Sequence, residues 1–120
     1  MKRYVVLIAY EPMSWESASE ATRQEYFAAH HAFEHYVDDH GRRLSSGALA
    51  DADTATTVRH VEGVATVTDG PFVESTEQVG GYYDIELPDL DSAIEASSLL
   101  PPAYAVEIRP TVVIEGYESV

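Results

Sequence analysis

The sequence has no cysteine and few basic residues. Without cysteine there is no disulfide, no thiolate metal site and no cysteine nucleophile, so any chemistry must use His, carboxylate, Tyr or Arg groups. Seven Lys and Arg residues stand against 21 Asp and Glu residues, which gives a formal net charge of -14. Because this charge repels polyanions, we expect no nucleic-acid partner and no attachment to an anionic membrane.

The opening apolar stretch, residues 4–9, is too short for a membrane span, which takes ~20 residues. No small-residue cleavage site follows it, as one would follow a signal peptide. We therefore expect a cytoplasmic protein. A length of 120 residues with 45% hydrophobic content predicts one domain, residues 1–120.

The first third of the chain predicts a strand followed by a long helix. Residues 2–10 form a nearly continuous apolar run that is typical of a central strand. Ser17 and Glu20 fit a capping box, and the helix that they open is expected to run to His40, with Gly41 ending it.

One face of this helix is expected to be buried. Tyr26, His30, Phe33 and Val37 follow one another at helical spacing and form one apolar stripe. His30 is therefore either a core histidine bonded to a backbone carbonyl or a functional imidazole.

The rest of the chain alternates strands, turns and one short helix. Gly80 and Gly81 predict a bulge or a close backbone approach within a strand. The second helix is expected to open at Pro88–Asp89 and to bury Leu90, Ala93, Ile94 and Leu100. The expected strands are residues 42–49, a hairpin of 55–61 and 64–68, 79–87 and 105–114.

This order, βαβ, hairpin, βαβ, predicts an α+β ferredoxin-like fold with an antiparallel sheet and both helices on one face. The other face is expected to be apolar and uncovered. Stacking two such sheets would bury it, so we expect a homodimer that encloses a pocket.

Residues 68–83, from Thr68-Asp69-Gly70-Pro71-Phe72 to the glycine pair and Tyr82-Tyr83, resemble the signature of the DGPF branch of the YCII-related family. The likeness extends over most of the chain, but it departs at Ser75, where members more often carry Thr followed by Lys. It implies a dimeric α/β barrel with one cleft per subunit. It also implies a catalytic dyad of His30 and Asp53, and Asp51 and Asp69 remain alternative partners for the histidine.

Further candidates for ligand binding are Arg59, Asp69, Tyr82 and Arg109. The two arginines are conspicuous among so few basic residues and suit a carboxylate, although each could instead pair with a nearby Glu. Asp69 could equally cap its own turn. Tyr82 and Tyr83 point to opposite faces of their strand, and packing is the simpler role of both.

We expect no metal and no cofactor. His31 and His35 have helical metal-ligand spacing but lack a third well-placed ligand. No phosphate-binding glycine loop or nucleophile elbow is present in the sequence.

Two functional hypotheses follow. The first is a cofactor-independent enzyme, an isomerase, lyase or peroxide-type activity, acting on a small aromatic or acidic metabolite with His30 as general acid or base. The second is a non-catalytic module that binds a small ligand or has a regulatory role, acting through a protein partner. A His30 close to a carboxylate in an open pocket favours the enzyme, and a sealed His30 favours the module.

Overall fold

The computed structural model describes residues 1–117, so residues 118–120 of the expected domain lie outside the described part. The elements, in chain order, are β1 (Lys2–Tyr10), α1 (Glu20–His40), β2 (Arg42–Ala48), the 3-10 helix η1 (Ala52–Thr54), β3 (Thr56–Val61), β4 (Val64–Asp69), β5 (Gln78–Leu87), α2 (Leu90–Ser97) and β6 (Ala105–Pro110).

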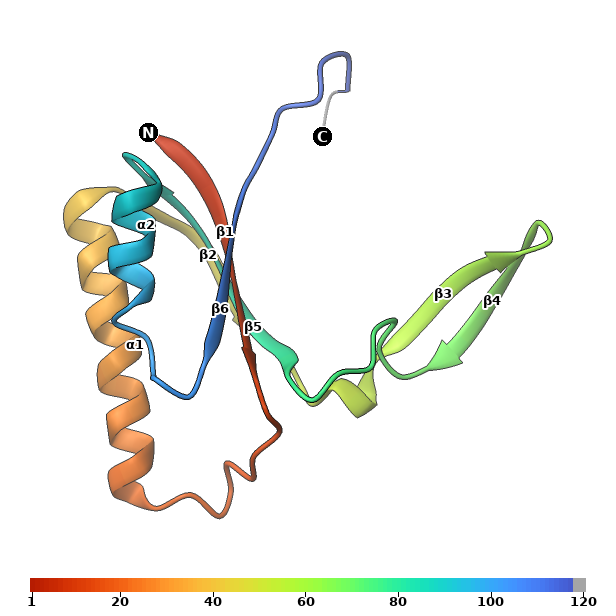
Figure 1. Ribbon diagram of the computed structural model, residues 1–120, viewed down its shortest axis with the longest axis horizontal. Coiled ribbons are helices and arrows are strands. Elements are labelled where there is room, and N and C mark those ends of the chain that lie inside the picture. The colour runs from red at the N-terminus through yellow and green to blue at the C-terminus, as the bar shows by residue number, and fades with distance from the viewer. Residues whose placement is uncertain (118–120) are drawn as a thin grey trace.

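Four strands form an antiparallel sheet in the order β2-β5-β1-β6. The β1–α1–β2 crossover passes over β5, and the β5–α2–β6 crossover passes over β1, so the two halves interlock. Both helices cover the same sheet face (Figure 1). The α+β ferredoxin-like prediction is confirmed. Among the described residues, no helix is long and apolar enough to cross a membrane.

The core lies between this face and the helices. Alternate residues of β1 and β5 point to it, as strand geometry requires. From α1, Phe33 and Val37 complete it, each at 0% exposure. The strand residues of the core are Tyr4, Val6, Ile8, Tyr83, Ile85 and Leu87.

The N-cap of the first helix lies two residues later than expected. Ser19, not Ser17, is the N-cap, and its hydroxyl accepts from the Thr22 backbone N–H at 3.1 Å. The Ser17 hydroxyl instead donates to the Ser14 carbonyl, within the preceding turn. The prediction was wrong because both serines precede, by three residues, a residue that can complete a cap: Glu20 follows Ser17, and Thr22 follows Ser19.

The buried face of α2 also differs from the expected one. Leu90 and Ile94 are 49% and 51% exposed. The buried residues of this helix are Ala93, Ala96 and Ser97. Small side chains allow a helix to approach its neighbours closely. In α2 this close approach decides which face is buried, and the larger apolar residues stay exposed.

The glycine pair in β5 behaves as expected. The pairing of β1 with β5 shifts between Ile8 and Ala9, which is a bulge. A side-chain carbon at Gly80 would overlap the ring and hydroxyl of Tyr10. Only glycine therefore lets the Tyr10 ring lie across β5 at this position.

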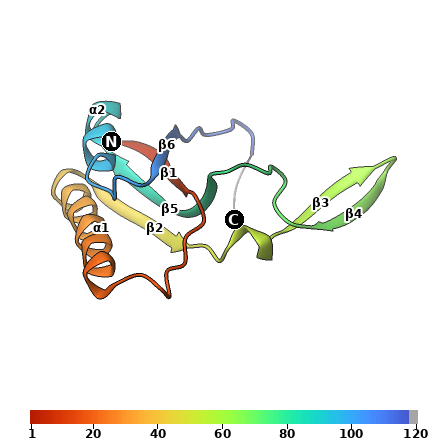
Figure 2. The same cartoon turned by 60° about the horizontal axis from the view of Figure 1, so that its bottom comes forward.

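Strands β3 and β4 form a separate two-stranded sheet, called the arm below (Thr56–Asp69). Figures 1 and 2 show it projecting from the rest of the molecule. Its valines are exposed, Val58 at 60% and Val67 at 63%. The radius of gyration is 16.7 Å, against ~14 Å for a compact chain of this length.

The sheet face away from the helices is mixed rather than apolar. Val5 and Leu7 lie on it, half-buried, beside Tyr82. Towards the other end of the same face, Arg3 makes a two-pronged ion pair with Asp84, at 2.9 and 2.7 Å. The expectation of a wholly apolar face was therefore wrong.

The last strand ends at Pro110, four residues before its expected end. One more pairing bond follows, in which Thr111 N–H donates to the Arg3 carbonyl at 3.0 Å. In this register Val112 would lie opposite Lys2, where β1 begins, so residues 113–114 have no strand residue to pair with.

Candidate functional site

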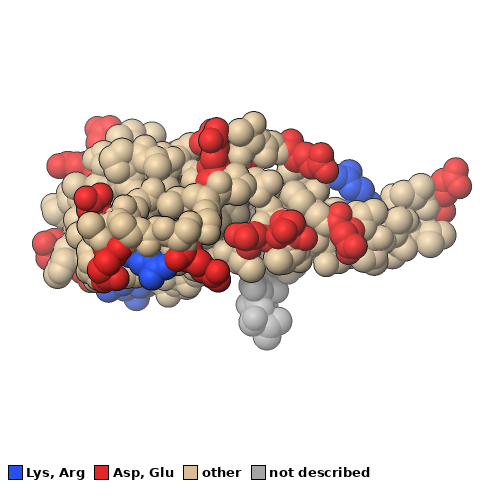
Figure 3. Space-filling model, turned by 90° about the horizontal axis from the view of Figure 1, so that it is seen from below, with Lys and Arg blue, Asp and Glu red and all other residues tan. Residues whose placement is uncertain are grey.

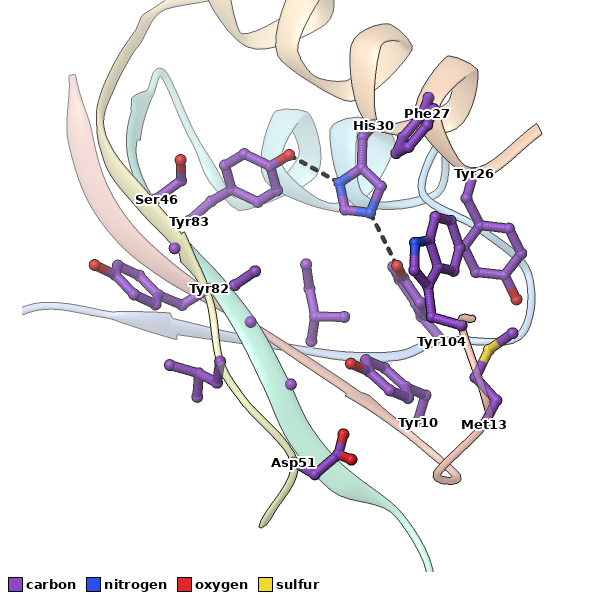
Figure 4. A pocket seen from close by; sticks show the side chains of 17 residues that line it. Tyr10, Met13, Tyr26, Phe27, His30, Ser46, Asp51, Tyr82, Tyr83 and Tyr104 are labelled. Carbon is purple, nitrogen blue, oxygen red and sulfur yellow. Dashed lines mark hydrogen bonds between the residues drawn. The ribbon is translucent and has the colours of Figure 1, made fainter. Parts of the chain in front are cut away.

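A cavity of about 480 Å³ lies between the first half of α1 and the adjoining end of the sheet. Figure 4 shows His30 on α1 facing into it, across from Tyr10 and Asp51. Its lining is rich in aromatic residues and comes from segments far apart in the chain. The aromatic lining residues are Tyr10, Trp15, Tyr26, Phe27, Tyr82, Tyr83 and Tyr104.

Both ring nitrogens of His30 have tyrosine partners. Nδ1 lies 2.8 Å from the Tyr83 hydroxyl, and Nε2 lies 2.9 Å from the Tyr104 hydroxyl (Figure 4). Tyr83 in turn donates to Glu34 Oε2 at 2.8 Å. A hydrogen-bonded chain therefore runs from a cavity tyrosine through the imidazole to a carboxylate.

Burial controls the protonation of this chain. The pKa of His30 is lowered, mainly because burial disfavours the imidazolium, and also by nearby His31, although Glu34 acts in the opposite direction. The pKa of Tyr83 is raised by burial and by its bond to Glu34. Burial and the neighbouring tyrosines raise the pKa of Tyr104 to about 12. Near neutral pH, His30 is therefore uncharged and both tyrosines are protonated.

Aromatic contacts hold the wall of the cavity in place. Tyr104 stacks on Tyr10 with ring centroids 5.4 Å apart and meets Tyr26 edge-on at 5.8 Å. Trp15 meets Tyr26 and Phe27 edge-on, at 5.7 and 5.6 Å. These are the separations at which aromatic pairs attract one another.

The charge around the cavity is negative. Asp51 lies on its lining, whereas no Lys or Arg of the described chain does so. Figure 3 shows acidic side chains spread over the face seen from below and few basic ones. An entering anion would have no cationic partner in this lining.

A second cavity of about 480 Å³ lies beside the first, at the base of the arm. Leu49 and Asp51 line both cavities. Pro71 and Phe72, from the turn after the arm, line only the second.

Within residues 1–117, no three His, Asp or Glu side chains come together as metal ligands. His31 and His35 therefore have no third partner of this kind in the described structure.

Comparison with known proteins shows the family to which this chain belongs. The profile of the YCII-related domain matches residues 2–115, nearly the full chain. This chain belongs to the YCII-related family. An uncharacterised protein of Rhizobium meliloti (strain 1021) is 38% identical over 66 residues, which covers 52% of this YCII-related chain and about half, 53%, of that relative. The resemblance found in the sequence is thereby confirmed at the level of the family.

Two of the residues expected at the site of this YCII-related protein, His30 and Tyr82, line the cavity. Tyr82 is next to Tyr83 in β5. In Figure 4 the Tyr82 ring points away from His30, as strand alternation requires.

Of the three acids considered as partners of His30, one lies on the lining of the cavity. Asp53 is exposed in η1 and is not among the residues lining the cavity, whereas Asp51 is. Within residues 1–117, the side-chain hydrogen bonds of His30 go to tyrosines and not to Asp53. The carboxylate closest to His30 by hydrogen bonding is Glu34, through Tyr83.

The remaining candidates lie outside the cavity. Asp69 ends β4 in the arm. Arg59, also in the arm, donates to the Phe72 carbonyl at 3.1 Å. Arg109, on β6, donates to Glu107 at 3.1 Å and has a 70% exposed side chain.

Tyr83 and Tyr104, the two partners of His30, were not predicted as site residues, and the sequence offered a signal for only the first. Tyr83 has the same strand phase as Ile85 and Leu87, so alternation alone assigns it to the helix side. Tyr104 follows Pro101 and Pro102 in a loop with no periodic pattern, and nothing local relates it to His30.

Proposed function

We propose that the cavity around His30 binds a small aromatic molecule and exchanges a proton with it, without a cofactor. The observation that carries this proposal is an imidazole held between two tyrosine hydroxyls at the wall of a cavity. A volume of about 480 Å³ suits a small organic ligand. An isomerase or lyase that removes and returns a proton fits this arrangement.

Charge narrows the class of ligand. The lining contains Asp51 and no described basic residue, so a carboxylate would be buried without a partner. Arg59 and Arg109, the residues expected to bind an acid, lie outside the cavity. We therefore propose an uncharged or cationic ligand, since a cation would also be attracted by the aromatic faces.

A series of probes of similar size tests this choice. Benzyl alcohol, benzylamine and benzoate share one ring and differ in charge. Trp15 is the single tryptophan and lines the cavity, so its fluorescence reports occupancy. We expect benzoate to bind about tenfold or more weakly than the other two, because its charge is buried unpaired.

Two histidine variants serve as controls for this titration. His30→Asn should weaken binding of the alcohol, whereas His60→Asn, in the arm, should leave it unchanged. Equal affinity for all three probes would overturn the proposed charge class. Binding that is indifferent to His30→Asn would place the probes elsewhere.

The second candidate function is ligand binding without turnover. It is favoured by the fact that both nitrogens of His30 already have hydrogen-bond partners. Deuterium exchange separates the two functions. Bound ligands that carry an acidic C–H group should exchange it in deuterated water with the wild type and not with His30→Asn, if proton transfer occurs.

We also propose that the protein works as a homodimer. Exposed valines on the arm, the half-buried apolar part of the open sheet face, and the extended shape of the single chain support this. A stable interface buries about 1,200–2,000 Å². The net charge of -14 disfavours close approach of two copies unless apolar surface is buried between them.

Sedimentation at micromolar concentration tests the dimer. Val58 and Val67 face each other across the arm. Replacing both by Asp should convert the dimer to a monomer. Leu90→Asp, an equally apolar exposed site on α2, should leave it dimeric. A wild type that sediments as a stable monomer would contradict the proposal.

A further inference from the structure

The hydrogen-bonded chain through His30 has a direction. A carboxylate has no proton to give, so the Tyr83–Glu34 contact of 2.8 Å requires Tyr83 to donate. The single hydroxyl proton of Tyr83 is then used, and its oxygen can only accept from His30 Nδ1, 2.8 Å away. Nδ1 therefore carries the proton.

The other nitrogen follows from this. An uncharged imidazole has one N–H, so Nε2 is bare and must accept. Tyr104, 2.9 Å away, is then the donor. The assignment comes from the network of partners, and it starts at the one group that can only accept.

Glu34 is itself held in position. It lies one helical turn after His30 on α1, so both side chains lie on the same face. Its second oxygen, Oε1, lies 3.4 Å from the Arg43 guanidinium. Arg43 also donates to Asp38 at 2.9 and 3.0 Å. The carboxylate therefore faces Tyr83 with one oxygen and a fixed cation with the other.

We propose that Glu34, acting through Tyr83, is a positioning residue that fixes His30 as the tautomer protonated on Nδ1 and makes Tyr104 the group that meets the ligand. Glu34 and Tyr83 were not among the residues expected at the site. The assignment of the tautomer stands on its own, and only its catalytic consequence depends on the proposed function.

The consequence is a balanced proton transfer. The acidic C–H bond of the ligand breaks, and its proton forms a new O–H bond on Tyr104. At the same time the former Tyr104 proton forms an N–H bond on Nε2 of His30. The ligand is left as an anion and His30 as an imidazolium, whose charge Glu34 stabilises through Tyr83. The reverse transfer, to another atom of the ligand, restores the protein and gives an isomerised product.

Nitrogen NMR of the free protein tests the tautomer directly. Two-bond proton–nitrogen correlations, recorded at about pH 7.5, distinguish a protonated ring nitrogen from a bare one. The His30 signals are assigned by their absence in His30→Gln. We expect Nδ1 to be protonated and Nε2 bare, and a protonated Nε2 would overturn the proposal.

Variants test which residue sets the tautomer. Glu34→Gln can donate to Tyr83 and so permits the reverse direction, and we expect Nδ1 to lose its fully protonated shift. Asp38→Asn also weakens the Arg43 cluster but does not touch Tyr83, so its spectrum should match the wild type. Tyr83→Phe, which breaks the link, provides the same readout should Glu34→Gln fail to fold.

An unchanged His30 tautomer in Glu34→Gln, or in Tyr83→Phe, would overturn the positioning role. The spectra are independent of ligand and turnover. The positioning role and the proposed function can therefore fail separately. Where turnover is found, Glu34→Gln should lower kcat about tenfold or more with little change in KM.

Discussion

The sheet with its two helices and the arm are built from similar local sequence, yet they differ in burial. In β1 and β5, alternate apolar residues such as Val6 and Ile85 reach 0% exposure under the helices. In the arm, Val58 and Val67 occupy comparable strand positions and remain 60% and 63% exposed. Strand formation and burial are thus separate properties: the first is local, and the second depends on what covers the strand.

This difference has a thermodynamic meaning for a single chain. Burial of apolar surface contributes about 25 cal/mol per Å², and the arm makes little use of it within the described residues. An isolated two-stranded hairpin is marginally stable in water. Burial against the second copy proposed above would therefore stabilise the arm, whereas the sheet and helices already bury apolar surface against each other within one chain.

The largest expected effect comes from truncating one apolar side chain in each of the two regions. Phe33 is fully buried, and its ring lies 4.4 Å from that of Tyr83. Phe33→Ala should lower the free energy of unfolding by about 3–5 kcal/mol because it leaves a cavity. Val67→Ala should change it by no more than about 0.5 kcal/mol when the protein is dilute and monomeric.

Urea unfolding followed by circular dichroism measures both variants under the same conditions. A loss at Val67 comparable to that at Phe33 would mean that the arm is already packed in the monomer, and the comparison would no longer hold.

A smaller effect is expected from two glycines. Gly80→Ala would force Tyr10 away from β5, at a cost of about 1–3 kcal/mol, and would distort the cavity that Tyr10 lines. Gly63, at the arm turn, has φ of +81° and open space around it. Gly63→Ala should cost about 1 kcal/mol, from backbone strain alone.

The Tyr10→Ala background separates these two mechanisms in a double-mutant cycle. It should relieve most of the cost at Gly80 and none of the cost at Gly63. A Gly80 cost that is unchanged in this background would exclude the steric explanation.

The elements of the fold were largely predictable because their signals are local. The apolar run of β1, the helical stripe ending in Phe33 and Val37, and the bulge at Gly80 each depend on residues near one another in sequence. The errors at Ser17 and at Leu90 arose where two local solutions were similar and tertiary packing chose between them. The burial of small residues in α2 depends on how closely that helix can approach the sheet.

The site was less predictable because its partners come from distant segments. His30 was identified from its helical position, but Tyr104 reaches it from a loop 74 residues away in the sequence. That pairing depends on β6 returning beside β1, which is a property of topology. The dyad of His30 and Asp53 stays a prediction: Asp53 is exposed in η1 and is not among the residues that line the cavity.

The smallest expected effect concerns the pH dependence of stability, and it again contrasts the two regions. Folding buries His30 and lowers its pKa below the ~6.5 of an unfolded chain. Between these two pKa values the unfolded chain binds a proton that the folded chain does not, so stability rises with pH in that window. The stabilisation is fully present above pH ~6.5 and is lost as pH falls through the pKa of the folded state. The slope from this one group cannot exceed about 1.4 kcal/mol per pH unit.

Unfolding free energies of the wild type and His30→Gln, measured from about pH 5 to 7.5 at fixed protein concentration, should therefore diverge in slope below pH ~6.5, with the wild type steeper. His60→Gln, in the arm, should stay parallel to the wild type because His60 is exposed in the folded chain. Equal slopes for the wild type and His30→Gln would mean that the imidazole is as well solvated as the arm, and the contrast between the two regions would fail at the site itself.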